Sequence, residues 1–197
     1  MASPRSGWRT SRDSLTLAGP CKRSSVEELR RRLATDTTDP EQQFAHALQL
    51  IEASHHLEDS NEMPKQARKY RESLLHEGMR VIKKLATTPV APGQPPFAEA
   101  QFYMANCYGN GRNGVSIDHV KSYHLYVQAS KQNHAAATYR TAVCNELGAG
   151  TKRNYELAMR FYRKSASLSD TAGMYKLGLI LLHGLLDQPA NPREAIV

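Results

Sequence analysis

The residues of this chain that are best able to do chemistry are its three cysteines and eight histidines. A thiol beside an imidazole can act as a nucleophile, and clustered cysteine and histidine side chains can hold zinc. Cys107 and Cys144 fall on the apolar faces of helical patterns, where a buried thiol is unreactive. The adjacent His55 and His56 point in different directions on a helix and have no cysteine or carboxylate to complete a metal set. The sequence therefore predicts neither an enzyme nor a metal site.

The run Gly109-Asn-Gly-Arg-Asn-Gly114 has the spacing of a dinucleotide-binding fingerprint. That fingerprint follows a strand and opens a helix within a βαβ unit. Here the run follows a helical pattern, and glycines recur at corresponding places further on, at 148, 150 and 184. Because glycine adopts the left-handed backbone that ends many helices, all of these glycines, Gly109 and Gly111 included, are interpreted as helix-ending turns. No cofactor is expected.

The glycine turns belong to a unit of about 36 residues that begins at Ala98 and begins again at Ala135 and Thr171. In each copy, apolar and small residues recur three and four positions apart, which predicts a first helix with one buried face. The predicted N-caps of the second helices, which can accept a hydrogen bond from a backbone N–H, are Asp118, Asn154 and Asn191. Such units predict an all-α solenoid of helix-turn-helix repeats. The expected repeats cover residues 98–134, 135–170 and 171–197, the third being incomplete.

Two longer helices are predicted before the repeats, within residues 36–87. The first is expected from Pro40 to Leu57 and the second from Pro64 to Leu85, because apolar residues recur in both at helical spacing. Those of the first helix are Phe44, Leu48, Ile51 and Leu57, and those of the second are Tyr70, Leu74, Met79, Ile82 and Leu85. We expect this atypical pair to cap the solenoid. A proline-rich connector at 88–97, which no helix can cross, joins the pair to the repeats.

The order of small residues, glycine, N-cap and paired aromatics resembles the Sel-one-like repeat, a relative of the tetratricopeptide repeat. Three runs are also similar to the fungal chitin synthase activators, namely Ala98 to Gly111, Tyr126 to Arg140 and Asp170 to Val197. This resemblance implies a non-catalytic regulator that binds the membrane-embedded chitin synthase and supports its delivery to sites of septum or cell wall growth. A general Sel-one-like repeat scaffold, such as a chaperone or degradation adaptor, stays open as the alternative.

The third copy stops before the position equivalent to Phe161 and Tyr162 of the second copy. We therefore expect Leu177, Ile180 and Leu181 to lack part of their cover, because an uncapped solenoid end exposes apolar surface. The chain is expected to be a truncated member of the family that it resembles.

The first 35 residues carry eight Lys or Arg against three acidic residues. Up to about Pro20 they hold few apolar side chains, which predicts a disordered tail, and a short helix is expected over Val26 to Leu33. The tail is a candidate for weak contact with an anionic membrane surface, and its Arg-rich, Ser-rich makeup also fits a mitochondrial transit peptide. Nucleic acid is not expected as a partner, because no aromatics alternate with the basic residues and no known module is present.

The cysteines and the hydropathy of the chain indicate the cellular compartment in which the protein is expected. Cys107 and Cys144 occupy the same place in successive repeats, on helices expected to pack about 8 to 10 Å apart, which is wider than a disulfide allows. Two buried free thiols favour the reducing cytosol. No apolar run approaches the roughly 20 residues that cross a bilayer. We expect a cytoplasmic protein that is peripheral at the plasma membrane or septum, with the mitochondrion as the alternative.

The predicted binding surface lies on the first helices, which line the concave side of tetratricopeptide-like stacks. Phe102, Tyr139 and Tyr175 share one register position and are expected to form an aromatic ladder, with Arg140 and Lys176 beside it. The other predicted site residues are Asn106, Val143, Glu146 and Leu179. Such a surface fits an extended or helical peptide of a partner protein, whose acidic groups the two cations would hold. The alternative is that these rings only pack between repeats.

Overall fold

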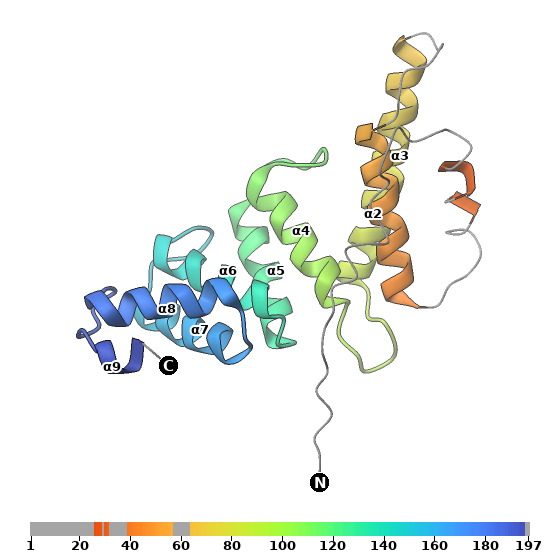
Figure 1. Ribbon diagram of the computed structural model, residues 1–197. Helices are drawn as coiled ribbons and strands as arrows, with labels where there is room; N and C mark the ends of the chain where they lie inside the picture. Colours follow the sequence, from red (N-terminus) through yellow and green to blue (C-terminus); the bar gives the residue numbers. More distant parts are fainter. Residues whose placement is uncertain (1–25, 29, 32–38, 57–63, 196–197) are drawn as a thin grey trace. The chain divides into compact units, whose positions relative to one another are not determined.

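The computed structural model describes residues 26–28, 30–31, 39–56 and 64–195, and within these ranges it contains helices and no strand (Figure 1). The helices are α2 (Pro40–His56), α3 (Pro64–Thr87), α4 (Ala98–Asn110), α5 (His119–Lys131), α6 (Ala135–Leu147), α7 (Tyr155–Ser167), α8 (Thr171–His183) and α9 (Pro192–Ala195). The all-α prediction is confirmed. The disorder predicted for the start of the chain and the position of Cys21 lie outside the described residues. The chain divides into two compact units, residues 1–78 and 79–197, within α3.

In the first unit, α2 and the first half of α3 enclose a small apolar cluster. Its buried members are Val26, Leu50, Ala53 and Leu74, with Tyr70 packed against them. The buried face of α2 differs from the predicted one: Ala47, Leu50, Ile51, Ala53 and Ser54 are buried, whereas Phe44 and Leu48 are half-buried. The reason is a close approach of α2 to α3, since a Cβ on Gly78 would lie 2.8 Å from the carbonyl oxygen of Ala47. Predicted Leu57 lies outside the described residues.

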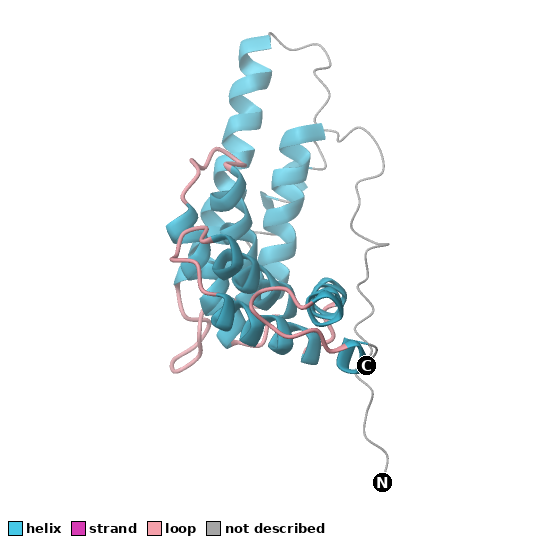
Figure 2. Cartoon of the chain, turned by 90° about the vertical axis from the view of Figure 1, so that its left-hand side faces the viewer, coloured by secondary structure: helices cyan, strands magenta, loops and turns pink. Residues whose placement is uncertain are grey.

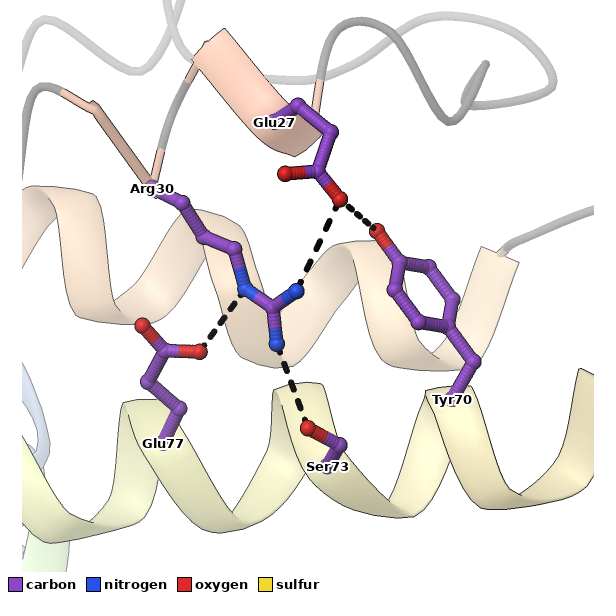
Figure 3. A network of polar contacts seen from close by, with 5 residues as sticks. All are labelled: Glu27, Arg30, Tyr70, Ser73 and Glu77. Atoms are coloured by element: carbon purple, nitrogen blue, oxygen red, sulfur yellow. Dashed lines mark hydrogen bonds and ion pairs between the residues drawn. The ribbon is translucent and has the colours of Figure 1, made fainter.

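Residues 26–28 and 30–31 are helical, as predicted, and a polar network joins them to α3 (Figure 3). Arg30 Nε donates to Glu77 Oε2 at 2.8 Å, and its NH2 group donates to Ser73 Oγ at 3.2 Å. Tyr70 donates its hydroxyl to Glu27 Oε1 at 3.1 Å, and the Arg30 guanidinium lies 5.4 Å from the centre of the Tyr70 ring. Together with the fully buried Val26, this network fixes the short helix on α3.

The second unit is a series of helix pairs. α4 packs against α5 and α6 against α7, while α5 meets α6 and α7 meets α8 to connect one pair to the next (Figure 1). Short loops join the helices (Figure 2). Two apolar clusters hold the pairs together, one around Ala105, Tyr126 and Ala137 and the other around Ala142, Tyr162 and Ile180. Tyr126 and Tyr162 are buried members of these clusters and fill the space between helices.

Helix ends in this unit follow the predicted capping with one correction. Gly111, Gly148 and Gly184 have left-handed backbones with φ of 64°, 77° and 65°, and each ends a first helix. Gly109, in contrast, lies inside α4. The absence of a side chain at Gly109 leaves room for α5, because a Cβ at this position would lie only 3.2 Å from Ser122 Oγ. Asp118, Asn154 and Asn191 accept from backbone N–H groups three residues on, at 2.9, 2.9 and 3.4 Å.

The end of the third copy is better covered than the sequence predicts. Ile180 is 0% and Leu181 is 3% exposed, and Leu177 is half-buried. Ile180 packs in the cluster formed by α6 and α7, while α9 packs against α8 and the N–H of Asn191 donates to the carbonyl of Leu181 at 2.6 Å. The expectation that these residues lack cover was therefore wrong for Ile180 and Leu181, because the preceding repeat and the loop before α9 bury them.

Candidate protein-binding surface

The nine predicted site residues come from three first helices and differ in exposure. α4 carries Phe102 and Asn106, α6 carries Tyr139, Arg140, Val143 and Glu146, and α8 carries Tyr175, Lys176 and Leu179. Arg140 and Tyr175 are exposed, and the other seven are half-buried. Solvent therefore reaches Arg140 and Tyr175 most and the other seven side chains only in part.

The three aromatic residues of the predicted ladder are not equivalent. The Phe102 ring lies 4.7 Å from the His134 ring and 6.0 Å from the Tyr126 ring, and the Tyr139 ring lies 5.9 Å from the Tyr162 ring. Tyr175, in contrast, is 70% exposed. Packing within the stack is therefore seen for the first two rings, while Tyr175 is the ring that a partner can reach.

A polar cluster joins α6, α7 and α8. Glu146 accepts a hydrogen bond from the Tyr162 hydroxyl and forms an ion pair of 2.9 Å with Lys176 Nζ. Lys176 also lies 6.0 Å from the centre of the Tyr162 ring. Burial and the hydrogen bond to the Glu146 carboxylate both raise the pKa of Tyr162, so its hydroxyl remains a proton donor. The structure thus brings the predicted Glu146 and Lys176 together around a tyrosine of the second helix.

A related cluster lies one repeat earlier. The Tyr126 hydroxyl donates to Asn106 Oδ1 at 2.7 Å. Burial raises the pKa of Tyr126, and the nearby positive charge of Arg140 opposes that shift. Arg140 stands at the same register position as Lys176, and Tyr126 at that of Tyr162. Each junction between repeats therefore combines a buried tyrosine hydroxyl, a polar acceptor and a cation from the next first helix.

Sequence reasoning missed the part that Tyr126 and Tyr162 play in these clusters. Their helical spacing predicts burial, which is correct, but a hydroxyl has no periodicity that shows where it points. One signal could have revealed the clusters: in both, the cation belongs to the repeat that follows the repeat of the tyrosine.

His134 is a second residue that the sequence did not reveal as important. Its Nδ1 accepts from the N–H of Ala137 at 3.1 Å and so caps α6, and its Nε2 lies 3.2 Å from Glu99 Oε1. This contact holds the pKa of the Glu99 carboxyl below its ordinary value. Histidine is not among the preferred N-cap residues, so only the register equivalence with Asp170, which caps α8, points to this role.

The two cysteines of the repeats, Tyr103 and the glycine run occupy packed or turn positions. Cys107 and Cys144 are buried free thiols, as predicted, and burial raises the pKa of both. Tyr103, at the register position of Arg140 and Lys176, accepts from Asn113 Nδ2 at 2.8 Å, and burial raises its pKa to about 12. The run from Gly109 to Gly114 begins inside the helix α4 and does not follow a strand, so the context of a dinucleotide site is missing there.

A hollow of about 440 Å³ lies where the end of α3 and the connector meet α4 and α5. Three glutamines border it. Gln132 Nε2 donates to the carbonyl of Pro96 and to Gln101 Oε1, both at 2.9 Å, and Gln101 Nε2 donates to Gln128 Oε1 at 3.2 Å. These amides pair mainly with one another and with the connector backbone, so they tie the connector to the first repeat.

No helix in the described part of the chain is long and apolar enough to cross a membrane.

Comparison with known proteins assigns the repeats. The Sel1 repeat model matches residues 98–134, 135–170 and 171–197. A crystal structure of a Sel1 repeat protein from Oxalobacter formigenes superposes with a TM-score of 0.54, at 21% identity over 89% of this chain and 67% of the other, which supports the solenoid fold.

Several fungal proteins are similar in sequence. Chitin synthase regulatory factor 2 of Schizosaccharomyces pombe is 33% identical over 51% of this chain. Two proteins of Saccharomyces cerevisiae follow, SHC1 with 34% identity over 60% of this chain and the chitin synthase regulator SKT5 with 27% over 83%. The match covers 20%, 22% and 24% of these three relatives, so the chain spans only a fifth to a quarter of their length. Together with the matched repeat model, these findings show that the chain belongs to the Sel1 repeat family.

Proposed function

We propose that this chain is a non-catalytic adaptor that activates or localises a chitin synthase during the synthesis of the fungal cell wall and septum. The names of two similar proteins, chitin synthase regulatory factor 2 and the chitin synthase regulator SKT5, support the link to chitin synthase. Burial of the two thiols in the repeats supports a role without catalysis. The proposed location is the cytoplasm, at the inner side of the plasma membrane or the septum.

The observation that carries the proposal is the exposed side of α6 and α8 beside the repeat junctions. Tyr175 offers a large ring, 70% exposed, and Arg140 offers an exposed cation. Lys176 is held by its ion pair with Glu146, and the half-buried Phe102 and Tyr139 pack against rings of the stack. Exposed tyrosine and arginine on a rigid scaffold are the residue types that contribute most to protein–protein binding. The remaining predicted residues, Asn106, Val143 and Leu179, complete the proposed surface.

The chemistry of this surface indicates what a partner segment must supply. An apolar or aromatic side chain would pack on Tyr175, and a carboxylate would pair with Arg140. Lys176 is already neutralised by Glu146, so it acts as support and not as a second site for an acidic group.

The test is a binding measurement between the purified chain and a detergent-solubilised fungal chitin synthase. We expect the double variant Tyr175→Ala, Arg140→Glu to bind at least about tenfold more weakly, because each residue is of the type that dominates interfaces. The matched control is Val120→Ala, Lys152→Glu, which alters one exposed apolar residue and one exposed cation away from the first helices. Circular dichroism checks that both variants keep the helical fold. Equal losses in the two variants would contradict the proposed surface.

A general repeat scaffold without a link to chitin synthesis is the second candidate function. It is favoured by one further relative, the activator of C kinase protein 1 of Saccharomyces cerevisiae, which is 28% identical over 68% of this chain. The same experiment separates the two candidates. A chain that binds no chitin synthase, in an assay where a full-length regulator does, would favour the scaffold.

A further inference from the structure

The helix α3 carries an unusual concentration of positive charge. Its 24 residues include seven Lys or Arg and two Glu. Five basic residues recur at spacings of four, seven, four and three along the helix, namely Lys65, Lys69, His76, Arg80 and Lys83. At 3.6 residues per turn these spacings place all five on one face, which we call the α3 basic row. Every member of the row is exposed.

The opposite face of α3 is apolar and turned inward. Ala67, Leu74, Ile82 and Ala86 are at most 2% exposed, and Met79 and Leu85 are at most 9% exposed. The buried face fixes the rotation of the helix about its own axis. The basic row faces solvent because the apolar face on the other side of the helix is buried.

The acidic residues of α3 do not neutralise the row. Glu77 pairs with Arg30 at 2.8 Å, and Glu72, which lies between Lys69 and His76, pairs with Arg68 at 2.9 Å. Among the carboxylates that the structure describes, none pairs with Lys65, Lys69, Arg80 or Lys83. As far as the described residues go, these four cations are available for an outside anion.

We propose that the α3 basic row is a docking surface for an anionic lipid bilayer. All five residues lie on one helix, over about 27 Å between Lys65 and Lys83 at a rise of 1.5 Å per residue. Long, flexible cations on one face of a helix can reach a layer of negative headgroups, and each Lys or Arg held near such a layer adds to the attraction.

The composition of the row favours lipid over single-stranded nucleic acid. Single-stranded nucleic acid binds where aromatic rings stack on its bases between the cations. The α3 basic row contains no aromatic residue, and Tyr70, the aromatic residue of α3, packs against the cluster around Leu50 and Leu74. The row therefore offers charge without a stacking surface.

The test uses the full chain and sedimentation with phosphatidylcholine vesicles, with and without phosphatidylserine. We expect the chain to bind the vesicles that contain phosphatidylserine and to be released at molar salt, where the Debye length falls to about 3 Å. The variant Lys69→Glu, Arg80→Glu, Lys83→Glu should bind them more than about tenfold more weakly, since three attractive charges become repulsive. These positions are exposed and glutamate suits a helix, so circular dichroism should be unchanged.

The matched control changes the net charge equally at exposed cations elsewhere, with Lys152→Glu, Arg160→Glu and Arg193→Glu. It should retain most of the binding. Equal losses in both triple variants, unchanged binding by the α3 variant, or no binding by the parent chain would each overturn the proposal. A further measurement tests single-stranded RNA, the other polyanion. If the α3 variant loses RNA binding but keeps vesicle binding, the proposal is also overturned.

Discussion

Gly150 and Gly114 stand in corresponding turns of two successive repeats and have almost the same backbone, with φ of 73° and 74°. Their surroundings differ. A Cβ on Gly150 would lie 2.0 Å from the carbonyl oxygen of His119, whereas a Cβ on Gly114 would meet nothing within 4 Å. The turn after α6 is thus pressed against the start of α5, and this contact joins the first repeat to the second.

Alanine at these two glycines should separate backbone strain from steric overlap. We expect Gly114→Ala to cost about 1 to 2 kcal/mol, which is the penalty of a left-handed backbone for a residue with a Cβ. Gly150→Ala bears the same penalty and should cost about 1 to 3 kcal/mol more, because the methyl group cannot fit without moving the turn. Urea unfolding of both variants gives the difference. Equal destabilisation would show that the contact with His119 is unimportant.

The buried Tyr162 bears on the rigidity of the proposed binding surface. Tyr162 is fully buried as a ring, yet its hydroxyl reaches Glu146 and through it holds Lys176. The exposed Tyr175 and Arg140 therefore project from a surface whose neighbours are fixed. Such preorganisation reduces the entropy that a partner must overcome on binding.

At the scale of elements, the short helix at residues 26–28 and 30–31 meets α3 through a side chain that makes several contacts. Arg30 gives it two of its hydrogen bonds to α3, to Glu77 and Ser73 (Figure 3). Arg68 on α3 pairs with Glu72, four residues away along the same helix. This exposed ion pair lies within α3 and should matter little to the position of the short helix.

Arg30→Ala should release this helix from α3, and Arg68→Ala should not. Hydrogen bonds to charged groups contribute about 1.5 to 3 kcal/mol, less here because Arg30 and Glu77 are partly exposed. We expect amide exchange around Val26 to accelerate roughly fivefold or more in Arg30→Ala, as local opening becomes easier. Hydrogen exchange with mass spectrometry measures this. Equal exchange in the two variants would show that Val26 alone holds the helix.

The whole chain consists of two compact units, and each has its own buried clusters. Leu74 lies in the cluster of the first unit and Ile180 in a cluster of the second, and both are 0% exposed. Neither side chain belongs to the cluster of the other unit. This arrangement predicts that the two units respond separately to damage in their cores.

Leu74→Ala and Ile180→Ala test this separation. Each removes a buried aliphatic side chain and should cost about 2 to 5 kcal/mol locally. We expect Leu74→Ala to accelerate exchange in α2 and in α3 up to Gly78 while α6 to α8 stay protected, and Ile180→Ala to do the reverse. Exchange that rises through both units in either variant would mean that the chain unfolds as one body.

Much of the fold follows from the sequence because it depends on local patterns. Helical spacing predicted α2 to α8 to within a few residues, since each first helix has one apolar face and a glycine or N-cap residue at its ends. The family resemblance came from the same small residues, glycines and aromatics, which are spaced by the packing of one helix against the next. The burial of Cys107, Cys144, Tyr126 and Tyr162 followed from that register as well.

Only the tertiary structure decided what depends on contacts between distant residues. Ile180 and Leu181 are buried because α6, α7 and the loop before α9 reach them, and no local pattern contains that information. Phe102, Tyr139 and Tyr175 share one register position, yet only Tyr175 is exposed, since the tyrosines under the first two rings come from second helices more than twenty residues further along the chain. Periodicity determines which face of a helix is turned inward, whereas the neighbours that lie across that face determine which side chains a partner can reach.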